Sequence, residues 1–141
     1  MYEPEAFNFV GNWLCLDFVN TLHDRATPAQ RDHFNTYTDL LWWSKGADIL
    51  TVEEIQSLLA EAQRRPEEAA LALRNAVVLR EAIYRIFAAV VREERPEGAD
   101  LHMLNVAYAE AMGKACIIQQ ESNFTWDWQA KETALERIQW D

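Results

Sequence analysis

The segment over residues 66–94 constrains the fold most, because after its first residue, Pro66, it contains neither glycine nor proline. Proline suits the first turn of a helix, where its missing amide hydrogen would have no partner in any case. We therefore expect one helix, roughly 40 Å long at ~1.5 Å per residue, which ends at Pro96-Glu97-Gly98. Its expected buried stripe consists of Leu73, Ala76, Val77, Ile83, Tyr84, Phe87, Val90 and Val91. A chain organised around such a helix is mainly α.

Shorter helices are predicted from apolar spacing and from residues that start or stop a helix. Thr51 and Glu54 form a capping box, in which each side chain bonds a free backbone amide of the first turn. Gly46 marks the end of an earlier helix. The predicted helices cover residues 12–22, 37–45, 51–65, 66–94 and 99–112, and helical spacing resumes from residue 130 to the end. In the helix over 99–112 the residues expected to face inward are Leu101, Leu104, Tyr108 and Ala111.

One β-hairpin is predicted near the C-terminus, with strands over residues 115–119 and 124–128 around the turn Glu121-Ser122-Asn123. Phe124, Trp126 and Trp128 alternate onto one face of it. A lone two-stranded ribbon is only marginally stable, so we expect it to dock on the helices. The predicted fold is thus a single domain over residues 1–141, an orthogonal helical bundle of about five to six helices with one β-hairpin.

Charge and composition exclude several classes of protein. The chain has 13 basic and 23 acidic residues, a formal net charge of −10. Proteins that contact nucleic acid usually neutralise phosphates with basic side chains, so we expect no direct nucleic-acid contact by this domain. The sequence has no basic start followed by an apolar block and no apolar run near the ~18 residues of a membrane span. We expect a cytoplasmic protein without membrane contact, in which Cys15 and Cys116 are buried free thiols rather than a disulfide.

The run Leu14-Cys15-Leu16-Asp17-Phe18-Val19-Asn20-Thr21 places an acid, an amide and a hydroxyl in an apolar segment. On a helix Asp17, Asn20 and Thr21 stand at i, i+3 and i+4 and share one face. Burying a polar group costs about 1–3 kcal/mol unless it is partnered. This polar trio therefore requires specific partners.

Two interpretations of the trio remain open. In the structural one, Asp17 pairs with Arg74 or Arg80 of the long helix, where Arg80 would be partly buried and would require an anion. In the functional one, the trio lines a cavity between the first and fourth predicted helices and contacts a small molecule. The candidate ligand-binding residues are Asp17, Asn20, Thr21, Arg80, Tyr84 and Trp43.

Catalytic and metal-binding signatures are missing from the sequence. It contains no nucleophile elbow, no phosphate-binding glycine loop and no His-Glu-x-x-His motif. His23, Asp24 and His33 lack a recognised ligand spacing, and neither cysteine belongs to a Cys-x-x-Cys pair. We therefore expect no catalytic residues, no enzymatic activity and no metal site in this chain.

Three segments resemble the ABATE domain: Gly-Asn-Trp-Leu-Cys-Leu-Asp-Phe-Val-Asn-Thr over 11–21, Leu-Arg-Glu-Ala-Ile-Tyr over 79–84, and Leu104-Asn105 followed by the aromatic hairpin. That domain is the N-terminal part of bacterial proteins that end in a CGNR-type zinc finger and are described as putative stress-induced transcription regulators. The resemblance implies a ligand-sensing or scaffold domain. Zinc and DNA contact would belong to a C-terminal module absent from this chain, to which the helix from residue 130 would lead. The alternative is a dimerisation or protein-interaction module without a ligand, such as a homodimer.

Overall fold

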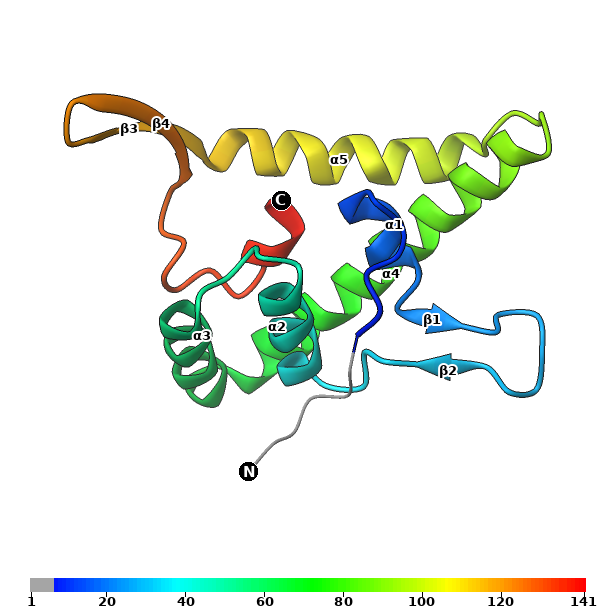
Figure 1. Cartoon of the computed structure of the whole chain (residues 1–141), viewed down its shortest axis with the longest axis horizontal. Coiled ribbons are helices and arrows are strands. Elements are labelled where there is room, and N and C mark those ends of the chain that lie inside the picture. The colour runs from blue at the N-terminus through cyan, green and yellow to red at the C-terminus, as the bar shows by residue number, and fades with distance from the viewer. Residues whose placement is uncertain (1–6) are drawn as a thin grey trace.

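The computed structural model describes residues 7–141, and this part of the chain is mainly helical, as predicted (Figure 1). Five α-helices and one 3₁₀ turn occur there, together with two antiparallel hairpins, β1–β2 and β3–β4. In chain order the elements are α1 (Leu14–Val19), β1 (Leu22–His23), β2 (Arg31–Asp32), α2 (Tyr37–Gly46), α3 (Val52–Arg64), α4 (Pro66–Val91), α5 (Gly98–Lys114), β3 (Ala115–Gln120), β4 (Asn123–Trp128) and η1 (Arg137–Trp140).

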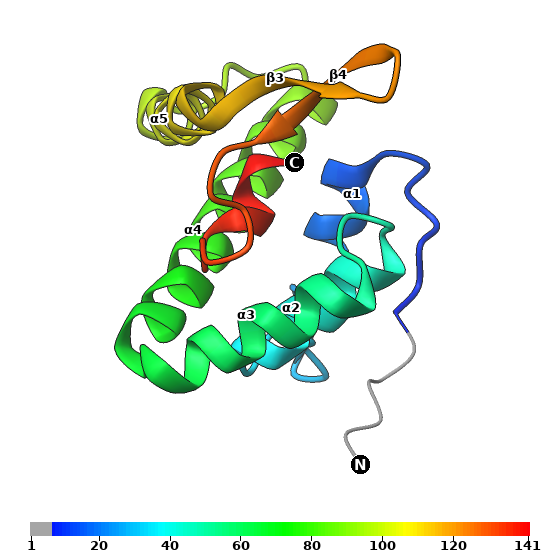
Figure 2. The ribbon, with the colours of Figure 1, turned by 90° about the vertical axis from the view of Figure 1, so that its left-hand side faces the viewer.

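Helices α4 and α5 frame the molecule. They meet at the right of Figure 1 and diverge toward its left. Two short elements lie between them: α1, which packs on α4, and η1, which packs on α5. Figure 2 shows α2 and α3 on the opposite side of the molecule from α5, with α4 running between them. None of the helices within residues 7–141 is long and apolar enough to cross a bilayer.

Local chemistry explains where the helices begin. The predicted capping box starts α3: the Thr51 hydroxyl accepts from the Glu54 amide, and the Glu54 carboxylate accepts from the Thr51 amide. A second box, formed by Thr36 and Asp39, starts α2 in the same way. Pro66 occupies the first turn of α4.

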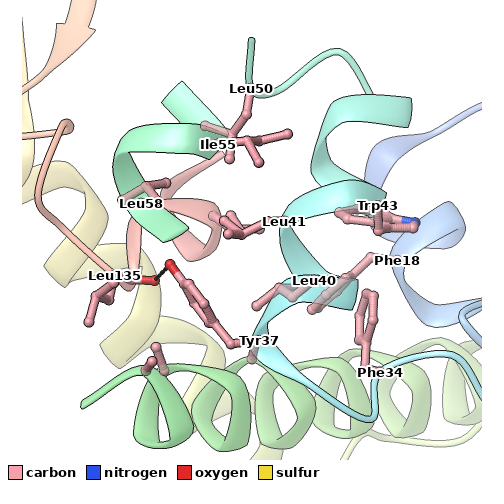
Figure 3. Packing of buried hydrophobic residues seen from close by; sticks show 14 residues of the cluster. Phe18, Phe34, Tyr37, Leu40, Leu41, Trp43, Leu50, Ile55, Leu58 and Leu135 are labelled. Atoms are coloured by element: carbon pink, nitrogen blue, oxygen red, sulfur yellow. Dashed lines mark hydrogen bonds between the residues drawn. The ribbon is translucent and has the colours of Figure 1, made fainter. Parts of the chain in front are cut away.

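The hydrophobic core lies where α2, α3 and the first half of α4 meet (Figure 3). Leu40 and Leu41 of α2 and Leu58 of α3 are almost fully buried. The last segment of the chain also enters this core, because the Tyr37 hydroxyl donates a 2.7 Å hydrogen bond to the Leu135 carbonyl. Its other buried members are Phe18, Phe34, Tyr37, Trp43, Leu50, Ile55, Ala69, Ala72, Ala76, Leu135 and Ile138.

The predicted apolar stripe of α4 is correct only over its first part. Leu73, Ala76, Val77 and Ile83 lie in or against the core, but Tyr84, Phe87, Val90 and Val91 are exposed. The helix continues past the end of the core, and none of these four residues belongs to the core cluster. In α5 Ala111 is buried as predicted, but Leu101, Leu104 and Tyr108 are exposed.

Both ends of the chain differ from the prediction. The first helix ends at Val19 rather than at residue 22, because Leu22–His23 pairs as a strand with Arg31–Asp32, a hairpin that was not predicted. The predicted final helix is wrong as well: the chain makes turns after Trp128 and then only η1. The C-terminal hairpin was placed correctly, but it projects from the end of α5 instead of docking on the helices (Figure 1). The orthogonal packing of the helices stays a prediction.

Candidate functional site

Arg80 is, among the described residues, the largest side chain that is less than 2% exposed, with a relative exposure of 1%. It lies on the face of α4 that meets α1 and the β1–β2 hairpin. Its guanidinium makes a bidentate pair with Asp32, with both N–O distances 2.8 Å, and donates to the Thr21 hydroxyl at 3.1 Å. Its Nε donates to Glu81 at 2.9 Å. The predicted buried arginine is therefore confirmed, but its anion is Asp32 and not Asp17.

Glu81 extends this cluster to a second arginine. Its carboxylate accepts from Arg25, which also donates to the Val19 carbonyl at 3.0 Å. The Arg25 guanidinium stacks 4.1 Å above the centre of the Tyr84 ring, so the exposed tyrosine covers this ion pair from outside. The two arginines and the two carboxylates of Asp32 and Glu81 balance in charge.

Electrostatics within the cluster favour the charged forms. Burial raises the pKa of the Asp32 carboxyl, but the hydrogen bonds from Arg80 and from the Phe34 amide, with the arginine charges, outweigh burial and hold that pKa below its ordinary value. Burial lowers the pKa of Arg80, and the bonds to Asp32 raise it above its ordinary value on balance. A guanidinium held by three partners has little capacity left for a ligand, so this cluster ties β2 and α1 to α4.

The three residues of the polar trio lie in different environments. The half-buried Asp17 carboxylate accepts a 2.7 Å hydrogen bond from the Gly11 amide. A side chain at Gly11 would lie 2.8 Å from the Leu16 Cβ, so only glycine allows this close approach. Thr21 is buried against Arg80, whereas Asn20 caps the end of α1 and is exposed. The prediction that all three share a buried face is therefore wrong for Asn20.

An apolar cleft of about 350 Å³ opens between α1, α2, α4, α5 and η1. This volume is in the range of small-molecule sites, which are about 300–1,000 Å³. We call it the apolar cleft; its lining residues are Leu14, Cys15, Phe18, Trp43, Ile49, Leu79, Ile83, Leu104, Ala107, Tyr108, Ala111, Met112, Ile138, Gln139, Trp140 and Asp141.

The chemistry of the apolar cleft is mostly that of aliphatic and aromatic side chains. Polar atoms are supplied by Tyr108, Gln139 and Asp141, and a half-buried free thiol by Cys15. Such a lining can bind an apolar molecule and orient it by a few polar contacts. Within residues 7–141 no three His, Cys, Asp or Glu side chains are grouped as a metal site would require.

Of the six predicted ligand-binding residues, only Trp43 lines the apolar cleft. Thr21, Arg80 and Tyr84 belong to the ion-pair cluster at the C-terminal end of α1. Sequence reasoning expected a cavity between the first and fourth helices, and a cavity lies there, but its walls come from the apolar residues around Asp17. Leu14 and Phe18, and likewise Leu79 and Ile83, are four residues apart, and this helical spacing of apolar residues is a sequence signal for two walls of the cleft. No sequence pattern indicated that η1 contributes to it.

Comparison with known proteins gives a single finding. The model of the ABATE family, described as "Putative stress-induced transcription regulator", matches residues 12–140. No curated protein and no solved structure matches the chain.

Proposed function

The chain belongs to the ABATE family, and from this premise we propose that it is the ligand-sensing domain of a bacterial, cytoplasmic, stress-responsive transcription regulator. The apolar cleft binds a small, largely apolar molecule. Contact with DNA is made by a zinc-finger module outside this chain, which also holds the zinc. The domain has no catalytic role.

The proposal rests on one observation: the residues that line the cleft come from both ends of the described chain. Leu14 and Cys15 lie near the N-terminus, while Ile138 and Trp140 lie in η1. A molecule in the cleft therefore contacts both ends of the domain and α5 at the same time. A ligand shifts a conformational equilibrium only when it binds two arrangements with different affinity. Because η1 is a short 3₁₀ turn, ligand binding in the cleft can change how η1 packs, and this is the simplest way for binding to affect a following module.

The proposal is tested by filling the cleft. Ala107 of α5 lines it, whereas Ala109, two residues on, is exposed and outside it. The probes are 2-naphthol and a saturated medium-chain fatty acid, and binding is followed by thermal shift and by the fluorescence of Trp43 and Trp140. We expect at least one probe to raise Tm, and the Ala107→Phe variant to lose this effect while the matched Ala109→Phe variant keeps it. No shift with either probe, or a shift that Ala107→Phe retains, would refute the proposal.

A second function is favoured by a separate observation, the exposed apolar residues of the β3–β4 hairpin. Phe124 and Trp126 are 74% and 73% exposed. Such residues favour an interaction module, and this role is compatible with ligand sensing because the hairpin tip lies outside the cleft lining.

A further inference from the structure

The buried hydroxyl groups of this domain have hydrogen-bond partners. Within residues 7–141 they belong to Thr21, Tyr37 and Ser44, and each donates to a backbone carbonyl at 2.7 or 2.8 Å. Buried indole N–H groups follow the same rule in most proteins, because a donor that is shielded from water loses free energy unless an acceptor replaces the water. A buried tryptophan N–H without a partner therefore indicates that a bound molecule supplies the acceptor.

Trp43 of α2 carries such an N–H. The residue is 2% exposed and packs among the rings of Phe9, Phe18 and Phe34. Its Nε1 makes no hydrogen bond in the described part of the chain, yet it is not one of the unpaired side-chain nitrogens that are fully shielded from water. Nε1 is therefore reached from open space, and the cavity that Trp43 lines is the apolar cleft. Figure 3 shows the indole nitrogen at the end of the ring that points toward α1, one wall of the cleft.

Trp140 of η1 is a second buried indole at the same cleft. It is 8% exposed, and its N–H has no hydrogen-bond partner among residues 7–141 either. By contrast, Trp128 lies outside the cleft lining and donates its N–H to Asp141 at 3.2 Å. Because Trp140 also borders a second hollow between α4, α5 and η1, we assign the missing acceptor to Trp43.

The other polar groups of the cleft leave little choice for the chemistry of that acceptor. The Gln139 amide already donates to a backbone carbonyl of α4, and the Asp141 carboxylate accepts from Trp128 and pairs with Arg137. No lysine, arginine or histidine lines the cleft within the described chain. An anionic ligand would therefore lie near a carboxylate with no cation facing it, which is costly in an apolar site. The acceptor is neutral.

We infer that the apolar cleft takes a compact, neutral carbonyl compound, whose oxygen accepts a hydrogen bond from Trp43 Nε1. This inference rests on the proposed function, since it names the class of molecule that the sensing cleft binds. A carbonyl oxygen is an acceptor only, so it satisfies the donor-only indole and brings no donor that would itself need a partner. The hydrocarbon part of the molecule packs on the aliphatic wall formed by Leu79 and Ile83. The volume of about 350 Å³ is near the lower end of the range of ligand sites, which favours a compact molecule.

Three naphthalene derivatives of similar size test the chemistry of the ligand. The compound 2-acetylnaphthalene carries a neutral carbonyl, 2-isopropenylnaphthalene has a CH₂ group in place of the oxygen, and 2-naphthoate has a carboxylate. Binding is measured by isothermal titration calorimetry. We expect 2-acetylnaphthalene to bind, and 2-naphthoate to bind at least about 10-fold more weakly.

The role of the indole N–H is tested by Trp43→Phe, which keeps an aromatic ring and removes the donor. Lost packing weakens the ketone and the alkene alike, so the ratio of their two dissociation constants isolates the hydrogen bond. We expect the preference for the ketone to fall by at least about 5-fold in Trp43→Phe. The matched control is Trp42→Phe, at the neighbouring tryptophan of α2, which lies outside the cleft lining and should leave the ratio unchanged.

A spectroscopic measurement on the wild-type protein does not depend on how well Trp43→Phe folds, which circular dichroism checks. A hydrogen bond to a carbonyl oxygen moves the ¹³C resonance of the carbonyl carbon downfield. For 2-acetylnaphthalene labelled at this carbon, we expect the bound signal downfield of its position in hexane, and a return toward that position in Trp43→Phe. A bound signal at the hexane position would overturn the inference.

The alkene separates failure of this inference from failure of the proposed function. If 2-isopropenylnaphthalene binds and Ala107→Phe blocks it, the cleft is a ligand site and the proposed function stands. If in that case Trp43→Phe leaves the ketone preference unchanged, or 2-naphthoate binds as tightly as the ketone, only the inference about the carbonyl is wrong. If none of the three compounds binds to the wild-type protein, both proposals fail.

Discussion

Replacing Arg80 with alanine is the most direct test of how the β1–β2 hairpin is held to α4. The change removes a guanidinium that is 1% exposed, together with the hydrogen bonds that it donates to Asp32, Thr21 and Glu81. Breaking a buried ion pair by removing one partner costs about 3–5 kcal/mol. Water can partly solvate the remaining carboxylates, because the Asp32 side chain is 33% exposed and that of Glu81 is 28% exposed. We therefore expect the lower end, a loss of about 3 kcal/mol in the free energy of unfolding.

The assay is urea denaturation followed by tryptophan fluorescence and circular dichroism. The midpoint should fall with little change in the slope m, which would show that stability and not the extent of unfolding has changed. Arg74→Ala is the matched control: Arg74 lies on the same helix but is exposed, and its loss should change stability by no more than about 0.5 kcal/mol. A loss below about 1 kcal/mol for Arg80→Ala would refute the assignment of Arg80 as the tie between these elements.

Acid provides an independent check on the same cluster. The pKa of Asp32 is lower in the folded protein than its ordinary value. Its pairing therefore contributes fully above the unfolded-state pKa, about 3.9, and is lost as the pH falls through the folded-state value. The stability difference between the wild type and Arg80→Ala should stay constant at neutral pH and shrink as the solution becomes more acidic than about pH 4. A difference that grows on acidification would contradict this assignment.

Three further measurements address other parts of the molecule. Tyr37→Phe removes the donor to the buried Leu135 carbonyl and should cost about 1–3 kcal/mol in urea denaturation; a neutral result would mean that another group satisfies that carbonyl. Thr51→Ala should cost about 1 kcal/mol through loss of the cap of α3, while Thr51→Ser keeps the accepting hydroxyl and should cost less. Alkylation of Cys15, followed by mass spectrometry, should slow when a probe occupies the apolar cleft, whereas Cys116, outside the cleft, serves as the internal control and should react at an unchanged rate.

Local features of the chain were predictable from sequence because neighbours in the sequence determine them. The start of α3 depends on Thr51 and Glu54, three residues apart, and the structure has it there. Pro66 at the start of α4 and the position of the C-terminal hairpin have the same origin. The family resemblance was equally local, and the matching family model confirms it.

Features that depend on distant partners were not predictable in the same way. Periodicity indicated that Arg80 is buried and requires an anion, but Asp32 is 48 residues away in a hairpin of two-residue strands, too short to give a pattern. The apolar repeat of α4 likewise continues to Val91, although the residues from Tyr84 onward in that repeat are exposed. Such a repeat shows that one face of the helix is apolar, but it does not show whether another element covers that face. The apolar cleft depends on η1, where helical spacing suggested a helix that does not form.

The hydrogen bond between Tyr37 and Leu135 joins residues 98 positions apart. Ribosomes make proteins from the N-terminus, so α2 and α3 emerge long before the segment that completes their packing. Until Leu135 and Ile138 arrive, the apolar surface that they cover is open to water and to chaperones. The nascent domain therefore cannot mature helix by helix, and its final tertiary step waits for the end of this segment's translation.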